Sequence, residues 1–301
     1  MTIVEAYAAC RTIARREAKN FYYAFRVLPR HKSDAMCAVY AFMRKADDIS
    51  DDESLTIDER RRAMATWVTA WRAARSSEVS EDPVFLALND TQRRFGISDE
   101  LLEELVQGTT MDLEPSLVPA GKLQTFANFD DLYRYCYLVA SVVGLVCIHI
   151  FGYSDKRAEK FAEETGIAFQ LTNILRDVKE DAERHRIYLP LDLLQKFGTN
   201  PDRILATVEG APIHGAERNA LRSLAARAEM YYASAEKLLP LINRDSRAAL
   251  WVLVNIYHNL LHRIEQRDGD VISKRVSVPT ATKLAILARG MGMALRNRVM
   301  P

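Results

Sequence analysis

Apolar residues recur at intervals of three and four along most of this chain, which is the pattern of helices that bury one face. The spacing predicts helices over residues 33–49, 58–75, 98–110, 130–151, 156–182, 216–238 and 244–267. No segment of comparable length alternates with period two, so no extended sheet is expected. Glycine and proline, 12 and 10 residues, stand mostly where a helical pattern stops. The chain is therefore predicted to be all-α.

The length of 301 residues is compatible with one large domain or with two fused halves. A hydrophobic fraction of 49% extends along the whole chain, and no low-complexity linker or repeat of fixed period divides it. We therefore expect a single helical domain over residues 1–301.

The charges are balanced, with 41 Lys and Arg against 40 Asp and Glu, which gives a formal net charge of +1. A general nucleic-acid binder would carry a strong basic excess, so no nucleic acid is expected as a partner. Any function that depends on electrostatics must therefore rest on local clusters of charged residues.

The expected location is the cytoplasm. Residues 1–20 mix charged and apolar side chains at helical spacing, unlike a signal peptide. Cys10, Cys37, Cys136 and Cys147 stand singly in apolar stretches, as core thiols of a reducing compartment do. The most apolar run, residues 138–151, is shorter than the roughly 20 residues that span a bilayer. We expect a buried core helix there.

An acidic run, DDISDD, ends the helix predicted over residues 33–49. Helical spacing places Asp47 and Asp51 on one face, about 6 Å apart along the axis. Two carboxylates at this spacing repel, and the negative end of the helix dipole adds to the strain. A divalent cation would supply the missing positive charge. The alternative is a solvated acidic helix end that leads into a loop.

A second polar stripe lies on the helix predicted over residues 156–182. Its members follow the series i, i+3, i+7 and i+11 and are Gln170, Asn173, Asp177 and Asp181. Amide and carboxylate oxygens on an inward face are costly unless they are satisfied, and they are the ligands that Mg²⁺ prefers. The alternative is a surface helix with ordinary ion pairs to Arg176, Lys179 and Arg184. Two acidic stripes in one chain favour a site that traps a diphosphate between metal-binding helices.

Five segments together resemble the successive blocks of the squalene/phytoene synthase family. They are NFYYAF, AVYAFMRKADDISDD, YRYCYLVASVVGLV, QLTNILRDVKEDAERHRIYLP and DVISKRVSVP. The resemblance extends from about Tyr7 to Leu287. It implies an isoprenoid synthase fold around a central cavity, Mg²⁺ ions between carboxylates and diphosphate, and a 1′-1 condensation of two prenyl diphosphates through a cyclopropyl intermediate. We expect that Mn²⁺ can take the place of Mg²⁺.

The resemblance also implies roles for individual residues. The metal ligands would be Asp47, Asp48, Asp51, Asn173, Asp177 and Asp181. The catalytic residues would be Arg44, Tyr137, Tyr188 and Arg275. The substrate-binding residues would be Lys19, Phe21, Tyr22, Tyr40, Gln170, Tyr257 and Lys274. Basic side chains would neutralise the departing pyrophosphate, and aromatic faces would stabilise an allylic cation. For each aromatic residue, plain core packing is the alternative.

The acidic run DDISDD is nearer to the squalene and presqualene branch of the family than the DELVD pattern often seen in phytoene synthases. This favours condensation of two farnesyl diphosphates to presqualene diphosphate, and on to squalene if NADPH delivers hydride. One departure is Ala-Lys-Asn at residues 18–20, where relatives often carry Ser-x-Ser. No GxGxxG turn for a nucleotide is present.

Three alternatives stay open. The first is phytoene synthesis from two geranylgeranyl diphosphates. The second is a head-to-tail elongating synthase, whose motifs usually read DDxxD. The third is a non-catalytic helical scaffold. A scaffold would be expected to have lost motif residues, whereas the carboxylates of both motifs and Asn173 of the second are present. The sequence does not predict an oligomeric state.

The segment over residues 280–300 is amphipathic and basic. One interpretation is peripheral contact with anionic lipid at the inner membrane face. The other is a last helix that covers the core.

Overall fold

The computed structural model describes residues 1–18, 22, 24–77, 80–113, 123–267, 270–272 and 275–299. The first third of the chain forms α1 (Ile3–Glu17), α3 (Arg30–Ser50), α4 (Ile57–Ser77), α5 (Pro83–Phe95), α6 (Asp99–Thr110) and the 3-10 turn η1 (Met111–Leu113). The middle third forms α7 (Phe129–Cys136), the π-helical turn η2 (Tyr137–Ser141), α8 (Val142–Phe151), α9 (Arg157–Arg176), α10 (Val178–Glu183), α11 (Leu191–Lys196) and α12 (Pro201–Val208). The last third forms α13 (Gly215–Leu238), η3 (Leu239–Leu241), α14 (Arg244–Glu265) and α15 (Thr280–Val299).

The all-α prediction is confirmed, because the regular structure of the described residues is helical apart from one short pair of strands. The two strands, β1 (Gln124–Thr125) and β2 (Arg186–Ile187), form one short parallel pair in which Gln124 faces Arg186. Several helices begin at a side chain that caps the first turn, as at Ser98, Asn128 and Asn200. Helix α5 ends at Gly96, whose φ of 61° favours glycine.

One predicted helix is wrong in detail. The segment expected to be continuous over residues 156–182 is divided at Asp177, whose φ of −103° and ψ of 13° end α9 and begin α10. The amide of Asp177 still donates to the carbonyl of Asn173 at 2.9 Å, and the amide of Asp181 donates to Asp177 at 2.9 Å. The break is therefore a local bend, and it lies in the middle of the second acidic motif.

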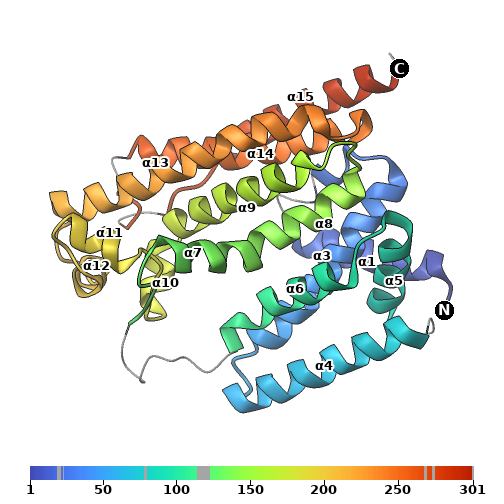
Figure 1. Cartoon of the computed structure of the whole chain (residues 1–301), viewed down its shortest axis with the longest axis horizontal. Coiled ribbons are helices and arrows are strands. Elements are labelled where there is room, and N and C mark those ends of the chain that lie inside the picture. Colours follow the sequence, from blue (N-terminus) through green and yellow to red (C-terminus); the bar gives the residue numbers. More distant parts are fainter. Residues whose placement is uncertain are drawn as a thin grey trace.

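Helix α9 lies at the centre of the fold, where it contacts α7, η2, α8, α13 and α14 (Figure 1). It approaches its neighbours closely because small residues face them. A Cβ atom on Gly166 would lie 2.5 Å from the Cα of Ser141 in η2. On the other side of η2, a Cβ on Gly108 of α6 would lie 2.3 Å from the carbonyl oxygen of Leu138. The π-helical turn is thus held between two glycines.

The segment Phe129–Phe151 is long and apolar enough to cross a membrane by length and composition alone. In the fold, none of residues 138–151 is exposed. One face of this segment is buried in the core, and residues such as Val139, Val143 and Cys147 line a cavity. This placement agrees with the predicted core helix.

A buried lysine joins three helices. Lys32 of α3 donates to the carbonyl oxygen of Phe151 at 2.7 Å, where α8 ends. It also donates to Asp245 at 2.8 Å and to Ser246 at 3.0 Å, where α14 begins. Its three ammonium protons are therefore satisfied, which a charge with a relative exposure of only 6% requires.

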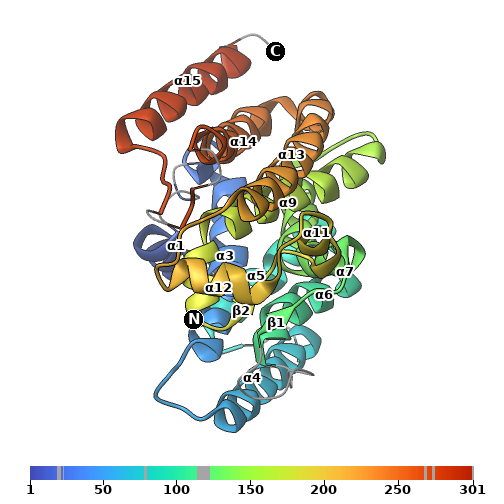
Figure 2. The same ribbon diagram turned by 90° about the vertical axis from the view of Figure 1, so that its left-hand side faces the viewer.

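Helix α15 lies at the edge of the molecule against α14 (Figure 2). Gly290 faces α14 closely, since a Cβ there would lie 2.3 Å from a methyl carbon of Val252. Leu284, Met291 and Leu295 face solvent on the other side of the helix, with exposures of 50%, 49% and 60%.

The contact between Gly166 and Ser141 predicts that Gly166→Ala is destabilising. The added methyl group must displace backbone on one side, and such overpacking costs about 1–3 kcal/mol. Thermal unfolding followed by circular dichroism should show a midpoint several degrees lower than that of the native chain. Gly292→Ala in α15 is the matched control, because nothing lies within 4 Å of its Cβ position, and alanine there should stabilise the helix slightly. Equal midpoints for both variants would contradict the close packing.

Candidate active site

A cavity of about 490 Å³ lies among α1, α3, α8, α9 and α14. Its polar lining comes from the carboxyl ends of α1, α3 and α9: Glu17, Arg44, Asp47, Gln170, Asn173 and Arg176. Its apolar lining comes mainly from the remaining turns of α3 and α9, from η2 and α8, and from α14. The cavity is therefore suited to a ligand with a charged head and a long apolar tail.

The first acidic motif stands at the end of α3. Asp47 lines the cavity, whereas Asp51 follows the last helical residue and is exposed. Asp48 points to solvent and forms an ion pair of 2.6 Å with Arg44. Arg44 itself lines the cavity, and its Nε is buried without a hydrogen-bond acceptor among the described residues. An anion at this point of the cavity would supply that acceptor.

The second motif begins with two amides on α9. Gln170 and Asn173 line the cavity, and Nδ2 of Asn173 donates to Oε1 of Gln170 at 3.3 Å. The Oδ1 atom of Asn173 is buried and has no hydrogen-bond donor among the described residues. A buried polar atom without a partner costs about 1–3 kcal/mol. This amide oxygen therefore fits the role of a ligand to a cation.

Asp177 lies between two arginines. Nε of Arg176 donates to its carboxylate at 2.8 Å, and Nη2 of Arg275 donates to it at 2.7 Å. Burial alone would raise the pKa of Asp177, but these two guanidinium groups hold the pKa below its ordinary value. Arg275 also contacts Glu180 at 3.1 Å. Asp177 is thus ionised at neutral pH and surrounded by positive charge.

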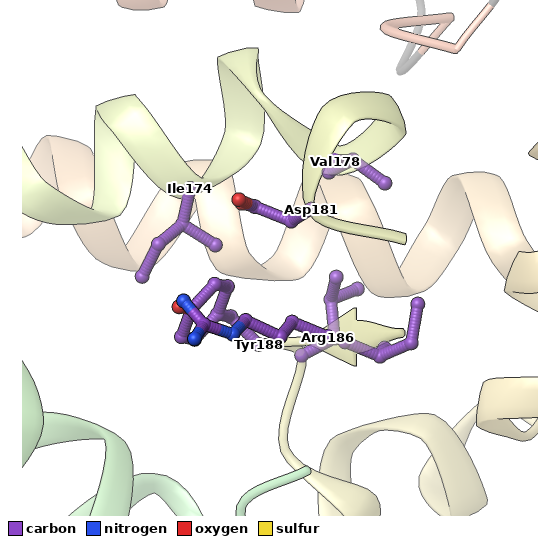
Figure 3. Close-up of a pocket in the computed structure, with 7 residues that line it drawn as sticks. Ile174, Val178, Asp181, Arg186 and Tyr188 are labelled. Atoms are coloured by element: carbon purple, nitrogen blue, oxygen red, sulfur yellow. The ribbon is translucent and has the colours of Figure 1, made fainter. Parts of the chain in front are cut away.

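Asp181 has the opposite environment. Burial, and after it the negative charge of Asp177, raise the pKa of Asp181 to about 7. In Figure 3 its carboxylate lies in a narrow gap, with Ile174 and Val178 on one side and Arg186 and Tyr188 on the other. Poorly solvated carboxylates that repel one another are relieved by a divalent cation. The amide oxygen of Asn173 and these carboxylates are oxygen donors of the kind that suits Mg²⁺.

A smaller cavity of about 310 Å³ adjoins the first, since Arg176 and Tyr257 contribute to both. Arg275 and Lys283 contribute cationic groups to its lining. The positive charge around Asp177 therefore continues from the main cavity into this second space.

The predicted tyrosines fall into two groups. Tyr40 and Tyr257 line the main cavity, and Tyr257 stacks on Phe169 with a centroid distance of 4.4 Å. Burial raises the pKa of both phenols, so they stay protonated at neutral pH.

The other group lies outside the lining of that cavity. The hydroxyl of Tyr137 donates to Glu104 at 3.0 Å. Tyr188 borders the gap at Asp181, stacks on Tyr135 at 5.1 Å and accepts from its hydroxyl at 3.4 Å. Tyr22 packs against the hydrophobic core.

The structure thus brings six predicted residues to one cavity: Arg44, Asp47, Gln170, Asn173, Tyr40 and Tyr257. It places Asp177, Asp181 and Arg275 at the end of α9 and beside it. The predicted residues Lys19, Phe21 and Lys274 lie outside the described residues. The roles of all these residues stay predictions.

The squalene/phytoene synthase family matches residues 14–282. The chain belongs to this family. Among solved structures, it is similar to a dehydrosqualene synthase with a TM-score of 0.81 and 28% identity over 98% of both chains. The squalene synthase HpnC of Alicyclobacillus acidocaldarius shares the fold with a TM-score of 0.78 and 24% identity, over 88% of this chain and 95% of that one. The predicted isoprenoid synthase fold is confirmed.

Two similar sequences are named phytoene synthases. The chain is 35% identical to the phytoene synthase of Mycobacterium tuberculosis, over 97% of this chain and 93% of that protein. It is 32% identical to the 15-cis-phytoene synthase of Synechococcus elongatus, over 96% and 94%. Family and relatives identify the chain as a prenyltransferase and support head-to-head prenyl condensation.

Sequence reasoning missed two charged residues of this squalene/phytoene synthase family member. Arg176 was considered only as a surface ion-pair partner, yet it lines both cavities and is 24% exposed. Its position between Asn173 and Asp177 was the signal that could have identified it. Glu17 gave no signal, because it reaches the cavity only through the packing of α1 on α3.

Proposed function

We propose that this protein condenses two farnesyl diphosphates head to head to presqualene diphosphate. The supporting observation is the cavity of about 490 Å³, which combines charged and amide groups from the ends of α3 and α9 with an otherwise apolar lining. A prenyl diphosphate has the same division into a charged head and an apolar tail.

The diphosphate would bind at the polar part of the cavity. We propose Asp47, Asp51, Asn173, Asp177 and Asp181 as Mg²⁺ ligands, with Asp48 beside them. When bound, the metal neutralises the diphosphate and makes it a better leaving group. Arg44 would donate to the same anion through the Nε that is buried without an acceptor among the described residues. Arg275, which is 57% exposed, would have to share its guanidinium between Asp177 and the diphosphate.

The apolar lining would orient the two chains and exclude water from the cation. In the proposed reaction, the C1–O bond of one substrate breaks, pyrophosphate leaves, and C1 bonds to the C2=C3 double bond of the second substrate. Loss of a proton then closes the cyclopropane. Released pyrophosphate is the candidate base, because the cavity tyrosines Tyr40 and Tyr257 stay protonated at neutral pH. The faces of Phe169 and Tyr257 offer cation–π stabilisation without a strong nucleophile.

The second candidate is phytoene synthesis from two geranylgeranyl diphosphates. The specific observation for it is the identity of 35% to a phytoene synthase over nearly the whole chain. Two observations favour the farnesyl substrate. They are the acidic run DDISDD and the similarity to a dehydrosqualene synthase structure.

Product analysis tests the substrate directly. The purified chain is incubated with Mg²⁺ and either farnesyl or geranylgeranyl diphosphate, with and without NADPH, and the extracted products are identified by mass spectrometry. We expect a C30 product from farnesyl diphosphate, and its response to NADPH shows how far the reaction runs. A C40 product alone would establish the second candidate. The absence of any product would favour the non-catalytic scaffold.

The metal-ligand assignment predicts that Asp47→Asn and Asp177→Asn each lower turnover by at least about 100-fold, because each change removes a negative charge that would hold the cation. The helical circular dichroism signal should stay near that of the native chain. Glu236→Gln on the exposed face of α13 is the control and should keep full activity. Near-native turnover of either aspartate variant at low Mg²⁺ would refute the assignment.

We also propose that α15 brings the protein to the inner face of the cytoplasmic membrane, where the long apolar chains of the product would enter the lipid. Leu284, Met291 and Leu295 share one exposed side of the helix, and Arg289 and Arg296 are exposed on another side of it. An exposed apolar face with basic residues on the polar face is typical of helices that lie on anionic lipid.

The triple variant Leu284→Ser, Met291→Ser and Leu295→Ser should sediment less with vesicles that contain phosphatidylglycerol. Met230→Ser removes an apolar side chain that is 74% exposed on α13 and should sediment like the native chain. Vesicles of phosphatidylcholine alone should bind all three proteins weakly. Unchanged sedimentation of the triple variant would dismiss membrane contact through α15.

A further inference from the structure

Two histidines and a glutamate meet where α13 and α14 pack together. Glu229 comes from α13, and His258 and His262 come from successive turns of α14. None of the three contributes to the lining of the two cavities. They are accessible from solvent, since their side chains are 43%, 30% and 50% exposed, respectively.

The potential ligand atoms of these residues already converge. One from each residue lies within 4.8 Å of the other two. Nε2 of His258 is 2.8 Å and 3.0 Å from the two carboxylate oxygens of Glu229. The rings of His258 and His262 are 4.2 Å apart between centroids. Small side-chain rotations would bring all three onto a zinc ion at its bond length of about 2.0–2.2 Å.

Neighbouring residues hold the two rings in place. Tyr232 stacks on His258 at 4.5 Å and is itself fixed, because its hydroxyl shares a hydrogen bond of 3.0 Å with Thr172 of α9. Glu265 lies 3.2 Å from Nδ1 of His262. A carboxylate on one ring nitrogen orients the imidazole and makes the other nitrogen a better ligand, as in many zinc sites.

A simple ion pair between His258 and Glu229 explains less of this arrangement. Such a pair involves only two of the three residues and does not account for the contact between the two imidazole rings. Neutral imidazole is the form of histidine that binds a transition metal. Exposed ion pairs also contribute little to stability, typically 0 to about 1 kcal/mol.

We propose that Glu229, His258 and His262 form a binding site for Zn²⁺, separate from the Mg²⁺ site of the acidic motifs. Two imidazole nitrogens and one carboxylate suit zinc better than magnesium, which prefers oxygen ligands. Three protein ligands leave the fourth tetrahedral position to water. Because the ligands come from two helices, bound zinc links α13 to α14.

Zinc binding to the full chain tests the site. The protein is freed of its affinity tag and of metal, and Zn²⁺ is titrated in competition with a chromophoric chelator. One zinc ion should bind per chain, and His262→Ala and Glu229→Gln should each weaken binding by at least about tenfold. Excess Mg²⁺ should not compete. Co²⁺ added in place of zinc should give the visible absorption of tetrahedral coordination, and the two variants should lose it.

Two controls separate this site from others. His31→Asn removes an exposed histidine outside the cluster and should bind zinc like the native chain. Asp177→Asn, which alters the acidic motif, should do the same. Circular dichroism of each variant checks that the fold is retained. Native affinity in His262→Ala and Glu229→Gln would overturn the proposal, and so would a loss of zinc in Asp177→Asn alone. Neither result depends on the proposed enzymatic activity.

Discussion

The close approach of α9 to the π-helical turn η2 is the constraint on which this fold depends. At Gly166 the backbones come so near that a methyl group would lie 2.5 Å from Ser141. A π-helical turn carries one extra residue per turn and is often found at functional sites. Here it joins α7 to α8 and presents Val139 and Ala140 to the main cavity. The same helix that packs most tightly therefore forms a wall of the cavity.

Because α9 is central, polar residues on it are costly to bury, and their positions indicate where the helix meets a cavity or a polar partner. A helix surrounded by other helices can carry amides and charges only where it meets a cavity or a partner. Gln170, Asn173 and Arg176 occupy its last two turns, where the cavity receives them. The break at Asp177 then turns α10 away, so the two aspartates of the second motif have different surroundings. Asp177 is ionised between two arginines, whereas Asp181 has a pKa raised to about 7.

These charges form one balanced system. Carboxylates from α3, from the junction of α9 and α10, and from α10 form ion pairs with Arg44, Arg176 and Arg275. A diphosphate brings negative charge and its cations bring positive charge, so binding would redistribute existing ion pairs. The stacked rings of Tyr257 and Phe169 connect this region to Tyr232, which supports the histidine pair on the other side of α14. The candidate active site and the proposed zinc site thus share one aromatic layer.

The sequence by itself determined the helical class, the position of most long helices and the two acidic motifs. Apolar spacing records which face of a helix is buried, and Asp47 and Asn173 stood out because polar residues interrupted or ended such faces. Only the tertiary structure decided which faces meet. It brought Glu17 and Arg176 to the cavity, directed Tyr137 to Glu104, divided the helix at Asp177 and joined Glu229 to His258. Helical periodicity fixes the direction of a side chain relative to its own axis, whereas its neighbours depend on how separate helices pack, and no local pattern contains that information.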